Sequence, residues 1–189
     1  MYNVQFTIVQ MQRCRRFFCK SLYIVNCKLT YSDLQERYTM THRELMTRAI
    51  ELAKQAASEG EVPVGAVIAR NGEIIAEGRN MREKGKNALY HAEIIAIDNA
   101  CKALDRWRLE DCTLYVTLEP CPMCTGAIIN SRISKVVYGA YDLKAGSVDS
   151  VINLFSLPYN HRPELHEGFM ENECRQLLTD FFSDIRLTP

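Results

Sequence analysis

The spacing of apolar residues from Thr41 onward predicts an ordered series of helices and strands. Residues 41–60 predict a helix that ends at Gly60, because apolar residues recur at helical spacing and glycine commonly follows a helix. Its apolar face comprises Leu45, Ala49, Leu52, Ala53 and Ala56. Residues 62–80 predict two strands joined at Asn71-Gly72, a dipeptide typical of tight hairpins.

Further elements follow with short connections. The pattern predicts helices at 91–104, 121–133, 147–155 and 171–182, and strands at 112–120 and 135–142. The apolar stripe expected for the first of these helices comprises Ile94, Ile95, Ala100 and Leu104. The strand at 112–120 is almost continuously apolar, which is typical of a strand buried on both faces. Strands separated by helices predict an α/β fold with three layers and a mixed central sheet, in one domain at residues 40–189.

Residues 1–39 differ from the rest of the chain because they contain neither glycine nor proline and show no clear period. Three interpretations remain open. The segment is an extension ahead of a working start at Met40, an arginine-rich targeting presequence, or an additional structural or binding segment. The first is the interpretation we favour at this point.

Composition narrows the class of protein. The net charge is zero, but residues 1–39 carry six basic and two acidic side chains, or +4, and the remainder carries −4. A globally basic nucleic-acid-binding protein is therefore not indicated. The eight cysteines lack the dense spacing of small secreted domains, which favours a reducing compartment. Apolar runs are too short for a membrane helix, and no uninterrupted signal-peptide core is seen in 6–29.

Two cysteines, Cys121 and Cys124, follow the buried strand directly in the stretch TLEPCPMC. Residues three apart share one face of a helix, so both sulfurs can reach one ion. A thioredoxin-like redox pair also lies at a strand-to-helix junction, and simple packing is a third interpretation. This motif alone leaves all three open.

His91 and Glu93 favour the zinc interpretation over the redox and packing interpretations. One imidazole and two thiolates make the three protein ligands of a catalytic zinc site, which keeps its fourth position for water. Glu93 would then be a free carboxylate. On a regular helix the two residues are about 200° apart, so they converge only if His91 lies at the helix start.

The pattern His91-Ala-Glu93 followed by Pro120-Cys-Pro-Met-Cys124 is typical of zinc-dependent nucleobase deaminases. The chain from about residue 41 to 183 resembles the bacterial tRNA-specific adenosine deaminases over much more than this motif. The matching stretches include EVPVGAVI (61–68), HAEIIAI (91–97), DCTLYVTLEPCPMC (111–124), VVYGAYDLKAGS (136–147) and NHRPELHEG (160–168).

This resemblance implies a cytidine-deaminase-like fold, a cytoplasmic homodimer and no membrane association. The implied substrate is the anticodon stem-loop of an arginine tRNA with an ACG anticodon, whose wobble adenosine at position 34 is converted to inosine. His91, Cys121 and Cys124 match the ligands of one Zn²⁺ per subunit. Glu93 matches the group that moves protons during hydrolytic loss of ammonia.

The resemblance also implies substrate-binding residues. Asn80 matches an asparagine that hydrogen-bonds the target base, although by itself it is typical of a turn cap. Asp142 and Lys144 match a loop that touches the RNA, although the pattern alone predicts a solvated turn. Tyr141 replaces the arginine expected beside Asp142. Phe181-Phe182 resembles an RNA-facing aromatic pair, whereas the pattern alone favours core packing for at least one of the two rings.

Two other functions remain open. A free nucleobase or nucleoside deaminase acting on cytosine, cytidine or guanine can use the same scaffold. A non-catalytic zinc-stabilised module that binds nucleic acid is the other, but a structural site has no use for Glu93 as a free carboxylate.

Overall fold

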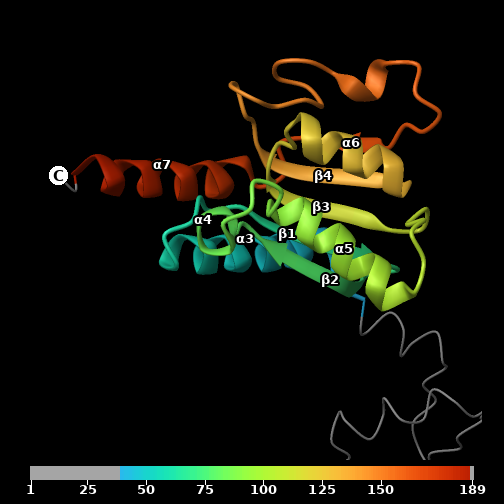
Figure 1. Cartoon of the computed structure of the whole chain (residues 1–189), viewed down its shortest axis with the longest axis horizontal. Coiled ribbons are helices and arrows are strands. Elements are labelled where there is room, and N and C mark those ends of the chain that lie inside the picture. The colour runs from blue at the N-terminus through green and yellow to red at the C-terminus, as the bar shows by residue number, and fades with distance from the viewer. Residues whose placement is uncertain (1–38, 188–189) are drawn as a thin grey trace, which may run out of the picture. The chain divides into compact units, whose positions relative to one another are not determined.

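A computed structural model describes residues 39–187, which contain a five-stranded sheet and its covering helices (Figure 1). The strands are β1 (Gly65–Arg70), β2 (Glu73–Arg79), β3 (Thr113–Leu118), β4 (Lys135–Ala140) and β5 (Glu164–His166). The helices are α3 (His42–Ser58), α4 (Arg82–Gly85), α5 (Ala92–Leu104), α6 (Pro122–Ser131), the 3-10 helix η2 (Leu154–Ser156) and α7 (Glu171–Leu187). The extension predicted for residues 1–39 lies outside the described residues, except for Thr39.

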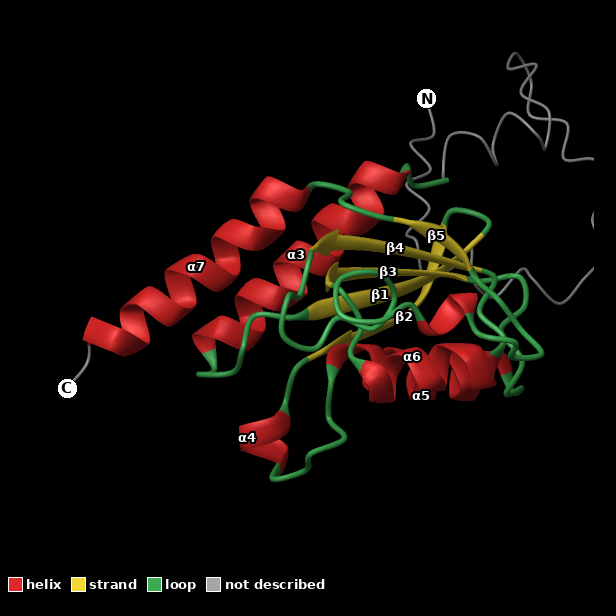
Figure 2. Cartoon of the chain, turned by 90° about the horizontal axis from the view of Figure 1, so that it is seen from above, coloured by secondary structure: helices red, strands yellow, loops and turns green. Residues whose placement is uncertain are grey.

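The strand order is β2-β1-β3-β4-β5. β1 pairs antiparallel with both β2 and β3, whereas the β3–β4 and β4–β5 pairs are parallel. Figure 2 shows α3 and α7 on one side of this sheet and α5 and α6 on the other. The predicted three-layer α/β fold with a mixed sheet is therefore confirmed. None of the helices in the described part of the chain is long and apolar enough to cross a bilayer.

Two hydrophobic cores lie on the two faces of the sheet, because successive strand residues point to opposite sides. On one face Val67, Tyr115 and Val137 pack with residues of α3 and α7. The other face packs Ile68, Leu114, Val116, Val136 and Tyr138 against α5 and α6. All five residues predicted for the apolar face of α3 are buried.

Two glycines let helices approach the sheet closely. A Cβ atom at Gly65 would lie 2.1 Å from the Ala49 carbonyl oxygen in α3. One at Gly78 would lie 2.2 Å from the Ala92 carbonyl oxygen, at the start of α5. α5 therefore rests on β2 through small residues. This corrects the predicted stripe, because Ala92, Ala96 and Ala100 are fully buried whereas Ile94 and Ile95 are only partly buried.

One local prediction is wrong, and two short elements were not predicted. The helix predicted at 147–155 is replaced by turns and η2, because the N–H groups of Val148, Asp149 and Ser150 donate to the Glu119 carboxylate instead of forming a helix. The short strand β5 was not predicted, since three residues are too few to show a period. The one-turn helix α4 was likewise not predicted. The remaining helices and strands agree with prediction to within a few residues at their ends.

Candidate metal centre and substrate cavity

Two helix starts bring the predicted metal ligands together. His91 is the residue before α5 and has extended backbone angles (φ −76°, ψ 151°), and Cys121 precedes α6 in the same way (φ −72°, ψ 172°). Pro122 occupies the first turn of α6, where its fixed φ suits the helix and no N–H is needed. Because His91 lies outside the regular helix, the geometric condition for its convergence with Glu93 on one cavity is met.

The distances among the three side chains fit a tetrahedral zinc ion. The Nδ1 atom of His91 lies 3.6 Å from the sulfur of Cys121 and 3.5 Å from that of Cys124. All three potential ligand atoms lie within 4.8 Å of one another. Zinc bonds of about 2.1 Å to nitrogen and 2.3 Å to sulfur place tetrahedral ligand atoms roughly 3.6 Å apart. The three side chains can therefore hold one zinc ion with little movement.

Electrostatics at the two thiols also favours a cation. A hydrogen bond from Cys124 and the neighbouring His91 lower the pKa of Cys121 to about 4, despite burial. The hydrogen-bonded Cys121, burial and Glu93 raise the pKa of Cys124 instead. The site thus readily forms one thiolate and resists a second negative charge. A divalent cation removes that conflict because it stabilises both sulfurs as thiolates.

Glu93 is a buried carboxylate on the same cavity. It lies in the first turn of α5, its side chain is 4% exposed, and burial raises its pKa to about 7. Among the described residues, the one group of three or more His, Cys, Asp or Glu side chains close enough to bind a metal comprises His91, Cys121 and Cys124 and leaves Glu93 out. Glu93 is therefore placed as a non-ligand carboxylate, with a pKa near neutrality that suits proton transfer.

The cavity has a volume of about 240 Å³, below the range of about 300–1,000 Å³ for drug-sized ligands, which suits a single ring system. Val62, Val64 and Leu118 supply its apolar lining. Its polar lining comprises Asn80, Arg82, His91, Glu93, Glu119, Cys121 and Asp142. The predicted residues Asn80 and Asp142 therefore line the same cavity as the predicted metal ligands His91 and Cys121.

The other predicted substrate-binding residues lie farther out. Lys144 is exposed and does not line the cavity, and its backbone N–H donates to Asp142 Oδ1 over 3.0 Å. Asp142 thus also caps its own turn, at the place where the pattern alone predicted a solvated turn. Phe181 and Phe182 pack edge to face on α7 with centroids 5.4 Å apart. Phe182 is 43% exposed and Phe181 partly buried, and neither ring joins a hydrophobic core.

A second buried carboxylate on the cavity, Glu119, was not predicted from the sequence, and it organises the loop after β4. It accepts backbone hydrogen bonds from Asp142 (3.1 Å), Asp149 (2.9 Å) and Ser150 (2.9 Å), and a short one from the Ser150 hydroxyl. Burial opposes its ionisation, but hydrogen bonds from Ser150, Asp142 and Asp149 outweigh it and lower the pKa of Glu119. The sequence does contain a signal for Glu119, because an acidic residue follows an apolar strand directly before Pro120.

Comparison with known proteins agrees with this site. The family model of the cytidine and deoxycytidylate deaminase zinc-binding region matches residues 39–140, which include His91, Glu93, Cys121 and Cys124. The chain therefore belongs to the zinc-binding cytidine and deoxycytidylate deaminase family.

Individual relatives indicate a narrower class within this family. The tRNA-specific adenosine deaminase of Bacillus subtilis is 52% identical over 149 residues, covering 78% of this chain and 92% of the relative. A structure from studies of A-to-I editing by tRNA:A34 deaminases at the wobble position of transfer RNA is 40% identical with a TM-score of 0.71. That match covers 72% of this chain and 100% of the other. The resemblance to the tRNA-specific adenosine deaminases, and the fold that it implies, are confirmed.

A guanine deaminase shares the scaffold at a lower level. The Bacillus subtilis guanine deaminase structure is 35% identical with a TM-score of 0.54, and the match covers 78% of this chain and 95% of the other.

Proposed function

We propose that this protein is a zinc-dependent hydrolase that converts the wobble adenosine at position 34 of a tRNA to inosine and releases ammonia. The observation that carries this proposal is the cluster of His91, Cys121 and Cys124, two of which line one cavity together with Glu93. The relative that is 52% identical, named tRNA-specific adenosine deaminase, supports the choice of substrate.

The roles of the site residues follow from their positions. His91, Cys121 and Cys124 would hold one zinc ion. A zinc ion held by these residues would lower the pKa of a water molecule bound to it. Glu93 accepts the proton of the attacking water on its carboxylate and delivers it to a ring nitrogen of adenine, and it then assists the departure of ammonia. Asn80 hydrogen-bonds the base, and Asp142 contacts the substrate at the cavity wall.

We extend the proposal to a substrate, an assembly and a compartment. The substrate is an arginine tRNA with an ACG anticodon, and Lys144 contacts its loop near the cavity. A homodimer is supported by exposed apolar residues close together in the chain: Val151, Ile152, Leu157 and Tyr159. The free cysteines of the described residues, Cys101, Cys112, Cys121, Cys124 and Cys174, fit a reducing cytoplasm. Sedimentation velocity tests the dimer, which should persist at micromolar concentration.

We also propose that residues 40–189 form the zinc-dependent deaminase domain and that residues 1–39 are an extension to it. The family match, which begins at residue 39, supports this division. A variant that starts at Met40 should bind one zinc per chain and keep the turnover of the full chain. A large loss of turnover in a folded, zinc-loaded variant contradicts this division.

One assay tests the substrate. Purified, zinc-loaded protein is incubated separately with the ACG-anticodon tRNA and with free adenosine, cytidine, cytosine and guanine. Inosine at position 34 with no ammonia from the small substrates is the expected result. The likeness to guanine deaminase makes a free-base deaminase the second candidate, and ammonia from small substrates alone would favour it.

A further inference from the structure

A buried carboxylate, Glu61, lies directly behind the substrate cavity. It follows α3 in the chain and is 1% exposed, and it is not among the cavity-lining residues. Its Oε2 atom lies 3.5 Å from Nδ2 of Asn80, whose side chain is 5% exposed and lines the cavity. Glu61 is thus in contact with the residue that the proposed function assigns to the base.

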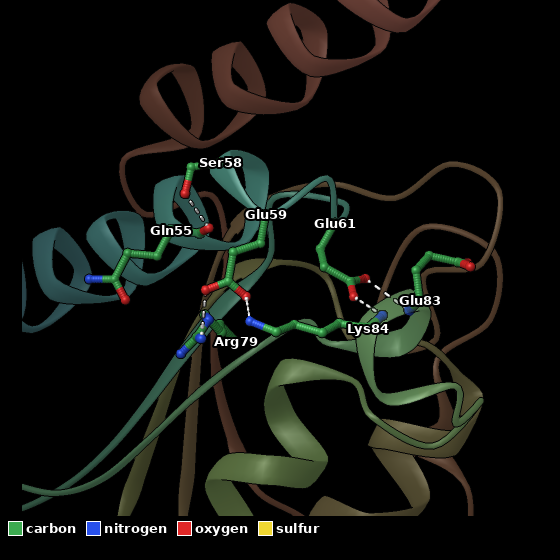
Figure 3. A network of polar contacts seen from close by, with 7 residues as sticks. All are labelled: Gln55, Ser58, Glu59, Glu61, Arg79, Glu83 and Lys84. Atoms are coloured by element: carbon green, nitrogen blue, oxygen red, sulfur yellow. Dashed lines mark hydrogen bonds and ion pairs between the residues drawn. The ribbon is translucent and has the colours of Figure 1, made fainter.

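The remaining contacts of Glu61 hold it in place as an acceptor. Its Oε2 accepts a hydrogen bond from the backbone N–H of Glu83 (3.2 Å), and its Oε1 accepts one from the N–H of Lys84 (2.8 Å), as Figure 3 shows. Both oxygens are therefore engaged by N–H donors of the one-turn helix α4. Glu61 therefore faces Asn80 as a hydrogen-bond acceptor.

The Glu61 carboxylate determines the orientation of the Asn80 amide. The amide carries two N–H donors on one branch and an acceptor oxygen on the other. Only the nitrogen branch can face Glu61, since the opposite orientation would set Oδ1 against a carboxylate oxygen. The backbone of Asn80 is also fixed, because its N–H donates to the Val64 carbonyl over 3.0 Å.

We propose that Glu61 is a positioning residue that locks the orientation of the Asn80 amide, and that this lock sets which nucleobase edge the cavity accepts. This inference rests on the proposed function and deepens it. Nucleobases differ in the order of donors and acceptors along their edges, so one fixed amide orientation discriminates among them. An amide free to rotate would accept either order.

The chain supplies a matched control in Glu59, two residues away. Glu59 pairs at the surface with the Arg79 guanidinium (2.9 Å) and the Lys84 ammonium (3.0 Å), and Figure 3 shows it beside Glu61. Glu59→Gln and Glu61→Gln remove the same charge from the same segment. Only Glu61→Gln replaces an acceptor next to Asn80 with a group that can donate or accept.

The kinetic test compares wild type, Glu59→Gln, Glu61→Gln, Asn80→Ala and the Glu61→Gln/Asn80→Ala double variant on the anticodon stem-loop. Glu61→Gln should lower kcat/KM by about 10–100-fold, the range for residues that orient a ligand-binding group, with one zinc per chain. Glu59→Gln should stay within about twofold of wild type, as expected for an exposed ion pair. The double variant should match Asn80→Ala alone, because interactions through one residue do not add.

Losses that add in the double variant would overturn the inference, since Glu61 would then act independently of Asn80. So would equal activity of Glu59→Gln and Glu61→Gln. Stem-loops with 3-deaza- or 7-deazaadenosine at the target position supply a second readout. Wild type should deaminate one of these two analogues more slowly than the other, because a fixed amide meets one base edge. Glu61→Gln should lose that discrimination, which a merely structural defect would not selectively remove.

An activity-independent measurement separates this inference from the proposed function. The side-chain amide signal of Asn80 in a ¹H–¹⁵N spectrum of the zinc-loaded protein is assigned by its disappearance in Asn80→Ala. Its hydrogen exchange should be slow in wild type and Glu59→Gln and at least about tenfold faster in Glu61→Gln, because a buried hydrogen bond is lost. Unchanged exchange refutes the lock whatever the substrate, whereas wild type inactive on tRNA refutes only the proposed function.

Discussion

Two parts of the substrate cavity are held in place by different means. His91, Glu93 and Cys121 lie at the starts of α5 and α6, where sheet and helix geometry fix the backbone. The walls at residues 80–90 and 141–153 are mostly loop, and Glu61 and Glu119 hold them by accepting backbone hydrogen bonds. The metal-binding part therefore depends on regular structure, whereas each wall depends on one buried carboxylate.

This difference predicts different effects for substitutions in the two parts. A change at the metal-binding part should remove the chemistry and leave the walls intact. A change at a wall carboxylate should leave zinc bound and impair substrate binding, since the N–H donors that it satisfies would lose their partner.

Cys121→Ser should abolish both zinc binding and deamination, because a serine hydroxyl is a poor zinc ligand beside one thiolate and one imidazole. Zinc content by mass spectrometry and inosine formation measure the two losses. Cys101→Ser is the matched control, since Cys101 lies on α5 away from the metal ligands and should keep one zinc per chain. Full zinc content in Cys121→Ser would show that the three-ligand assignment is wrong.

Glu93→Gln should keep zinc and lower kcat by about 10²–10⁴, the usual contribution of a positioned general acid or base. The amide has the same shape as the carboxylate but cannot accept the proton of the attacking water. Single-turnover deamination of the stem-loop measures the step directly. Glu110→Gln, at an exposed ion pair with Arg108, is the charge control. Near wild-type turnover in Glu93→Gln would exclude this role for Glu93.

Glu119→Gln should lower kcat/KM by about 10–100-fold, as expected when a supporting group near a site is lost. One of its oxygens becomes an NH₂ group that faces backbone donors at residues 148–150, so the wall loses hydrogen bonds. Most of the effect should fall on KM, with zinc content unchanged. Glu164→Gln, at the surface pair with Lys135, is the control. A loss of zinc in Glu119→Gln would contradict the independence of wall and metal site.

The same residue predicts a pH dependence of stability. Hydrogen bonds hold the pKa of Glu119 in the folded protein below its ordinary value of 4.5. Its ionised form therefore stabilises the fold above about pH 4.5, and this contribution is lost as the pH falls through the lowered pKa. Urea unfolding of wild type and Glu119→Gln should show a difference at pH 7 that shrinks below pH 4.5. A stability difference that grows below pH 4.5 would show that ionised Glu119 does not stabilise the fold.

The sequence was sufficient for the metal-binding part because its chemistry appears as short, local patterns. His91-x-Glu93 and Cys121-x-x-Cys124 each lie within one turn of a helix start, and hydrophobic period predicted both helices. The resemblance implied Asn80 and Asp142 in the walls, but the hydrogen bonds that hold the walls were not predicted. Glu119 contacts residues 23 to 31 positions away, where no local pattern carries information. The helix predicted at 147–155 failed for the same reason: a distant carboxylate, not local propensity, determines that backbone.

A weaker effect is expected at Lys144, which belongs to the wall at residues 141–153 but does not line the cavity. This exposed side chain follows Leu143, which is 82% exposed, on the turn that Asp142 caps. One lysine near an RNA phosphate contributes mainly screened attraction, so Lys144→Ala should raise KM for the tRNA about two- to fivefold at low salt and leave kcat unchanged. The difference should disappear at higher salt. Lys102→Ala, at the far end of α5 and paired with Asp98, is the control and should change neither constant. Equal KM values for Lys144→Ala and Lys102→Ala at low salt would remove Lys144 from the RNA-contacting surface and limit substrate recognition to the cavity walls.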